Sequence, residues 1–185
     1  MSVAEKDFQT EFLRGLRTQT RNAWKIPDLP VSLMKAGRFT EKKPFDCFFT
    51  HKRLKGKMVV CELKQARAGT LNVSGKSHGL QDHQEDALLT TVDQDGFGLV
   101  VVNFQFQLKG DAARRAGYAD VDRAFAGQIE DVVAARVNDR TDSLKVAWWE
   151  KNGVEMPLCS VKDEHGKDLR AWDPAPLIDW LWEWV

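Results

Sequence analysis

The sequence predicts a mixed α/β domain, and three observations lead to this expectation. The chain has 185 residues, of which 43% are hydrophobic and 29% charged, a composition typical of one globular domain with its own core. Helical periodicity marks both ends of the chain, and short apolar runs with the composition of strands lie between them. We therefore expect a single domain over residues 1–185, in which helices flank a mixed β-sheet.

The first helix is expected over residues 3–22. Its apolar residues recur at four-residue spacing, as in an amphipathic helix: Phe8, Phe12 and Leu16. Residues 25–44 then contain several prolines and a glycine, which favours an irregular connection. Because so long a connection is unusual in a compact domain, a short strand around Phe39 is the alternative.

Two strand-like segments, 45–50 and 58–64, come next. The polar residues between them include Gly56 and have the length of a hairpin loop. Residues 80–93 fit a helix that places three residues on one side: Leu80, Gln84 and Leu88. After two glycines, residues 99–102 form a continuous apolar run, typical of a strand buried on both faces.

The second half of the chain is expected to add helices and one hairpin to this core. Residues 105–142 have the charge and periodicity of a helical insertion. Segments 146–149 and 154–161 predict a second hairpin around Asn152-Gly153. Pro174 can open a final helix, whose buried residues would be Leu177, Ile178, Leu181 and Trp182.

Charge is balanced over the whole chain but divided between its halves. Residues 1–80 hold 16 Lys+Arg and 7 Asp+Glu, an excess of +9, whereas residues 81–185 carry the opposite excess of −9. Such an asymmetry is typical of a protein with a polyanionic partner, although a solvated basic face gives the same pattern. The charge distribution therefore keeps nucleic acid among the candidate partners.

Several classes of protein are excluded by the motifs that the sequence lacks. No apolar stretch approaches the ~20 residues of a membrane span, so we expect no membrane association. The acidic, polar N-terminus does not fit a signal peptide, and three cysteines make neither a disulfide framework nor a CxxC metal site. We also find no P-loop, no GxGxxG and no arrangement typical of a Ser-His-Asp triad. A reducing, cytoplasmic location is the resulting expectation.

Three charged residues of the predicted hairpin belong on one face of the sheet. Because residues two apart share a face, pairing of the strands can bring Asp46, Glu62 and Lys64 together opposite an apolar face. A second carboxylate would repel the first, and a hard cation such as Mg²⁺ between them removes this repulsion. The lysine could then orient a metal-activated water or stabilise charge on a phosphate. The alternative is an exposed ion pair of Glu62 with Lys64, and Asp46 in a turn.

The motif Pro44-Phe45-Asp46, followed by Glu62-Leu63-Lys64 on the next strand, resembles that of the PD-(D/E)xK nucleases. Within that superfamily the chain is most similar to the RecU-type Holliday junction resolvases. Three further segments carry the resemblance: 11–16 on the first helix, 70–71, and Asp82-His83-Gln84. The resemblance implies a restriction-endonuclease-like α-β-β-α-β core over residues 3–104, with the insertion and a C-terminal hairpin and helix over 105–185.

The resemblance also implies roles for individual residues. Mg²⁺ or Mn²⁺ would be held by Asp46, Glu62, the carbonyl of Leu63, and Glu11. Lys64 would position or activate the attacking water, the metal would stabilise the departing 3′ oxygen, and Gln84 would support the lysine or the water. Basic residues around the hairpin can contact DNA phosphates: Lys42, Lys43, Lys52, Arg53, Lys55, Lys57, Arg67 and Lys76.

The implied activity is paired cleavage of four-way DNA junctions by a homodimer, since symmetrical incision needs two identical sites. The protein would act in the cytoplasm of a bacterial cell or of a phage-infected host. Two alternatives remain on the same sequence. One is an exonuclease of the phage or repair type, or another endonuclease, built on the same core. The other is a catalytically silent DNA-binding domain.

Overall fold

The structure is a computed structural model that describes residues 3–27, 43–67, 69–74, 79–105 and 122–185. A mixed six-stranded sheet lies at its centre, in the order β1-β2-β3-β5-β6-β8. Its strands are β1 (Ala23–Lys25), β2 (Cys47–Thr50), β3 (Met58–Arg67), β5 (Phe97–Gln105), β6 (Arg123–Gln128) and β8 (Val154–Met156). β3 and β5 are parallel, and all the other neighbouring strands are antiparallel.

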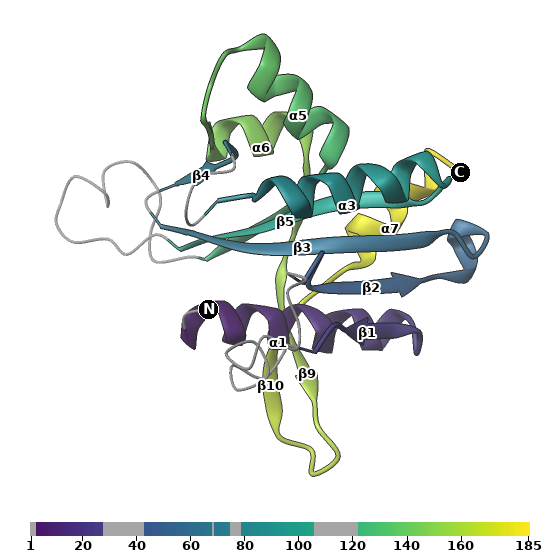
Figure 1. Ribbon diagram of the computed structural model, residues 1–185. Helices are drawn as coiled ribbons and strands as arrows, with labels where there is room; N and C mark the ends of the chain where they lie inside the picture. The colour runs from purple at the N-terminus through teal and green to yellow at the C-terminus, as the bar shows by residue number, and fades with distance from the viewer. Residues whose placement is uncertain (1–2, 28–42, 68, 75–78, 106–121) are drawn as a thin grey trace, which may run out of the picture.

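Helices cover both faces of this sheet (Figure 1). One face packs against α1 (Val3–Gln19) and α7 (Ala175–Trp182), whose apolar residues share a buried cluster with Cys47, Cys61 and Leu63. The other face packs against α3 (Asp82–Asp93), α5 (Ile129–Asn138) and α6 (Val146–Asn152). Because both faces are covered, the central strands β3 and β5 consist largely of buried apolar residues.

Smaller elements surround the sheet. The hairpin of β9 (Leu158–Lys162) and β10 (Asp168–Trp172) extends past α1 in Figure 1, and β10 packs against that helix. A short antiparallel pair joins β4 (Thr70–Asn72) to β7 (Ser143–Lys145). The loop between β2 and β3 contains one turn of 3-10 helix, η1 (Lys52–Leu54).

The first half of the chain follows the sequence expectation closely. Phe8, Phe12 and Leu16 are buried on α1, and β2 and β3 form the predicted hairpin. The strand expected at residues 99–102 is longer and spans all of β5. The helix expected over residues 3–22 ends at Gln19, and β1 between it and the connection was not expected. The alternative strand around Phe39 lies outside the described residues.

The second half contains three corrections. Residues 123–128, expected to be helical, form β6 inside the central sheet, between β5 and β8. Residues 146–152 form α6 rather than a strand, and the hairpin is made by β9 and β10 instead. The final helix is present with Leu177, Ile178 and Leu181 buried, but Trp182 is exposed because it lies on the outer side of the helix.

No helix within the described part of the chain is both long and apolar enough to cross a membrane.

Candidate functional site

Asp46, Glu62 and Lys64 lie together on the hairpin of β2 and β3. Glu62 and Lys64 stand two residues apart on β3, whereas the intervening Leu63 packs into the cluster beneath α1. Asp46 directly precedes β2, and its main-chain NH donates to the carbonyl of Cys61 across the hairpin. The exposed fractions are 5% for Asp46, 2% for Glu62 and 8% for Lys64. Three ionisable residues are therefore buried at one place.

Two donors hold the Asp46 carboxylate. The main-chain NH of Leu63 donates to its Oδ2 at 2.9 Å, and Lys43 Nζ donates to its Oδ1 at 2.7 Å. The first bond links Asp46 directly to β3, the strand that carries Glu62. It therefore fixes the position of the Asp46 carboxylate relative to Glu62. Because a carboxylate oxygen can accept more than one bond, Asp46 retains lone pairs for a further ligand.

A second set of contacts ties the lysine to Glu62 and to helix α3. Lys64 Nζ lies 2.9 Å from Glu62 Oε1 and donates to Gln84 Oε1 at 2.9 Å. Gln84 Nε2 donates to Glu62 Oε1 at 2.5 Å, and Gln84 Oε1 also accepts from the main-chain NH of Gln81 at 3.0 Å. The first turn of α3 thereby fixes the side chain of Gln84, which in turn fixes Lys64.

The environment of Glu62 favours its protonated form. Burial, followed by the nearby charge of Asp46, raises the pKa of Glu62 to about 8, against the opposing effect of Lys64 and Lys43. Its second oxygen, Oε2, is buried and has no hydrogen-bond partner among the residues that the structure describes. A buried carboxylate oxygen without a partner is costly, and a cation bound to it would remove the cost.

These features test whether the residues fit a divalent metal ion. Two buried carboxylates, one with an oxygen that lacks a partner, provide hard oxygen ligands. Mg²⁺ is commonly held by only one or two carboxylates, with waters and substrate phosphate completing its shell. Within the described ranges, no group of three or more His, Cys, Asp or Glu side chains is placed to bind a metal. The residues therefore fit an ion that shares its coordination with water and substrate.

Glu11 does not join this pair of carboxylates, contrary to the sequence expectation. It lies on α1, across the sheet from Gln84, and its Oε2 accepts from Arg170 Nε at 3.1 Å and from Trp172 Nε1 at 3.2 Å. Burial raises the pKa of Glu11, Arg170 and Trp172 oppose the rise, and the charge of Asp122 adds to it. Glu11 therefore anchors the β9–β10 hairpin to α1 instead of serving the carboxylate site.

The basic residues predicted to contact DNA are scattered. Lys43 binds Asp46 at the site. Four others occupy the loop beyond the far end of β2, where three of them have protein partners: Arg53 bonds Asp179, Lys55 the carbonyl of Val185, and Lys57 Asp95, while Lys52 is exposed. Lys42, Lys76 and the side chain of Arg67 lie outside the described residues. The loop lysines are therefore not gathered around the carboxylates.

The sequence reasoning missed an aromatic patch beside the site, made of Trp24, Phe45 and Phe48. Trp24 pairs with Phe48 across β1 and β2, and their rings are stacked with centroids 5.1 Å apart and an interplanar angle of 23°. Phe45 meets Phe48 edge-on at 6.3 Å. The three residues Trp24, Phe48 and Glu62 share a face because the register pairs Trp24 with Phe48 and Phe48 with Val60, which lies two residues before Glu62.

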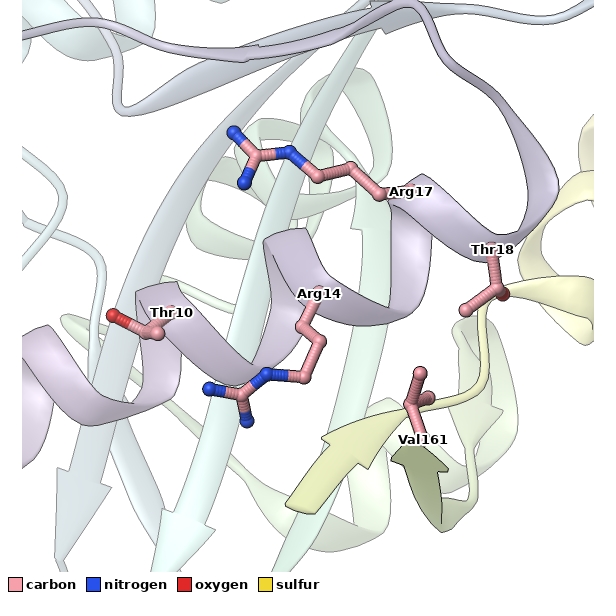
Figure 2. Close-up of a pocket in the computed structure, with 5 residues that line it drawn as sticks. All are labelled: Thr10, Arg14, Arg17, Thr18 and Val161. Atoms are coloured by element: carbon pink, nitrogen blue, oxygen red, sulfur yellow. The ribbon is translucent and has the colours of Figure 1, made fainter. Parts of the chain in front are cut away.

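A cavity of about 320 Å³ lies elsewhere, between α1 and β9 (Figure 2). Thr18 and Val161 point toward each other across it, whereas the guanidinium groups of Arg14 and Arg17 point in different directions. Arg14 is also bonded to the main-chain carbonyl of Arg170. The two guanidinium groups therefore do not converge on one point in this cavity.

Comparison of the sequence with models of protein families and with curated proteins finds no match.

Proposed function

We propose that this protein is a metal-dependent DNA endonuclease of the PD-(D/E)xK type, with a restriction-endonuclease-like core and with four-way junctions as its preferred substrate. The observation that carries the proposal is the buried set of Asp46, Glu62 and Lys64, in which Glu62 Oε2 has no hydrogen-bond partner within the described part of the chain. Preference for junctions, and a homodimer that makes paired cuts, rest on the resemblance of the motif segments to RecU-type resolvases.

In this proposal Asp46 and Glu62 hold Mg²⁺ or Mn²⁺. Bound there, the ion would act as a Lewis acid that lowers the pKa of a water and offsets charge on the phosphate. Glu62 would have to lose its proton before it could bind the ion. Asp46 would have to bind the ion while its carboxylate also contacts Lys43. The two carboxylates would thus attract a cation, whose positive charge would offset their repulsion of the anionic phosphodiester.

Lys64 and Gln84 act on the reacting groups. Lys64 Nζ, directed by Glu62 and Gln84, can hold the attacking water or donate to a phosphate oxygen. The water would lose one proton to solvent, and its oxygen would bond to phosphorus as the bond from phosphorus to the 3′ oxygen breaks. The 3′ oxygen would take up a proton from solvent, which leaves a 5′-phosphate and a 3′-hydroxyl. Gln84 is a positioning residue, because it acts through Lys64.

The test is cleavage of labelled four-way junction, fork, linear duplex and single strand by the purified protein, with Mg²⁺ and with EDTA. The proposal predicts cuts within the junction strands that require Mg²⁺ and are lost in Lys64→Ala, while Glu11→Gln remains active. Degradation of duplex from its ends would favour an exonuclease instead. Junction binding without cleavage, insensitive to Lys64→Ala, would favour a silent binding domain.

A further inference from the structure

Beside the carboxylate site, the sheet is less covered by helices at β1 and β2 than at its centre. α3 packs mainly on β3 and β5, while α1 contacts β1 on the opposite face. The aromatic patch lies in this less covered area: Trp24 is 44% exposed, and Phe45 and Phe48 are half-buried. A large aromatic surface is therefore accessible next to the place where the chemistry is proposed.

The rings are assembled in advance of any ligand. Pairing of β1 with β2 sets Trp24 against Phe48, and Phe45 supports Phe48 from its edge. Phe45 and Phe48 also pack against the buried cluster beneath α3, which limits their movement. A rigid ring that already has one stacking partner can accept a flat ligand on its remaining surface at little cost in conformational entropy.

The position of the patch indicates what that ligand is. Phe45 adjoins Asp46 in sequence, and Phe48 lies only two residues beyond it, about 7 Å along an extended chain. A nucleotide whose phosphate lies at the carboxylates therefore has its base within reach of the rings. Duplex stacking hides the faces of paired bases, so only an unpaired or unstacked base can use the patch.

Charge favours DNA over a second copy of this chain as the occupant. Basic residues lie close to the patch in sequence: Arg21 and Lys25, which are exposed, and Lys43, which bonds Asp46. Two such surfaces brought face to face would repel each other, whereas a polyanion is attracted.

We propose that the aromatic patch stacks an unpaired base next to the scissile phosphate, so that the substrate class is DNA with unpaired or unstacked nucleotides. This inference rests on the proposed function, because it places the DNA backbone at the carboxylate site. It extends that function by naming the feature that the enzyme recognises, an unpaired or unstacked base. Junctions, forks and tailed ends share this feature, and a continuous duplex lacks it.

The test is binding in EDTA, which requires neither metal nor cleavage. Fluorescence anisotropy would compare a labelled duplex carrying a single-stranded tail with the same duplex made blunt. Trp24→Ala should weaken binding of the tailed DNA by about 5- to 150-fold, the range expected for loss of one stacked base, with blunt duplex unchanged. Trp24→Phe should retain most of the affinity, and Trp184→Ala, at an exposed tryptophan near the C-terminus, is the matched control.

Equal weakening for both DNAs, or no weakening of the tailed one, would overturn the inference. So would conversion of a dimer to a monomer by Trp24→Ala, since the patch would then bind a second copy. If Trp24→Ala lost binding of tailed DNA only, but the wild type cleaved no DNA, the proposed nuclease activity would be refuted and the stacking retained. If the wild type cleaved DNA and Trp24→Ala bound tailed DNA normally, the stacking would be refuted and the nuclease activity retained.

Discussion

Replacement of Glu62 by glutamine should change how the stability of the metal-free protein depends on pH. Glu62 is 2% exposed, its pKa is raised to about 8 by burial and by Asp46, and its ordinary value is 4.5. Between these two values the folded protein retains a proton that the unfolded chain has released. Stability therefore falls as pH rises through this window, and the favourable contribution is fully present only below about pH 4.5.

The size of the effect follows from the width of the window. At about 1.4 kcal/mol for each pH unit, the difference between 4.5 and about 8 corresponds to at most roughly 4–5 kcal/mol. This is a large part of the ~5–15 kcal/mol that holds a typical domain folded. Glutamine has nearly the same shape but does not ionise, so Glu62→Gln should be more stable than the wild type at pH 8 and similar to it near pH 5.

Urea unfolding in EDTA at several values between pH 5 and pH 8 would measure this effect. The quantity to compare is the difference in free energy of unfolding between wild type and variant, because the other titrating groups are common to both proteins. Glu164→Gln, at an exposed residue of the β9–β10 turn, is the control and should give a flat difference. If the difference in free energy of unfolding between wild type and Glu62→Gln were also independent of pH, the raised pKa of Glu62 would be refuted.

Two further predictions concern packing and an ion pair. Gly15→Ala would ordinarily favour a helix, but here the added Cβ would lie 1.7 Å from the carbonyl oxygen of Trp172, so α1 and β10 must separate. We expect a loss of about 1–3 kcal/mol in urea unfolding, and a gain would contradict this close approach. Arg136→Ala should cost about 1–3 kcal/mol by thermal or urea unfolding, because Arg136 makes paired bonds to Glu85 on α3 and a third to the carbonyl of Val73. Arg136→Lys should recover only part of that loss, since lysine lacks the planar fork, and full recovery would contradict the role of the paired geometry.

The hairpin of β2 and β3 was predictable because its signal is local. Alternation along two short strands places Cys47, Cys61 and Leu63 in the buried cluster beneath α1. The same alternation turns Glu62 and Lys64 toward α3. The helical spacing of residues 80–93 likewise placed Gln84 on the side that meets Lys64. The two-residue period of strands and the 3.6-residue period of helices are sufficient to predict which side of an element a residue occupies, where that side depends only on neighbours in sequence.

The errors occurred where distant residues decide the outcome. Trp148-Trp149 has the composition of a strand, yet it forms α6 because Trp149 packs into the core against Phe104, with ring centroids 6.3 Å apart. Tertiary packing here overrides local propensity. The resemblance to resolvases assigned Glu11 to the metal site, but its partners Arg170 and Trp172 lie some 160 residues away. No spacing rule in a single sequence shows such a contact.

The central claim is that Asp46 and Glu62 together bind a divalent cation. Electron paramagnetic resonance measures it directly, by counting Mn²⁺ bound to the wild type, to Asp46→Asn, to Glu62→Gln and to Glu11→Gln. The account predicts that the wild type and Glu11→Gln bind Mn²⁺ equally well, while both carboxylate-site variants lose most of the bound ion. Binding by Asp46→Asn or Glu62→Gln as tight as that of the wild type, or no binding by the wild type, would contradict it.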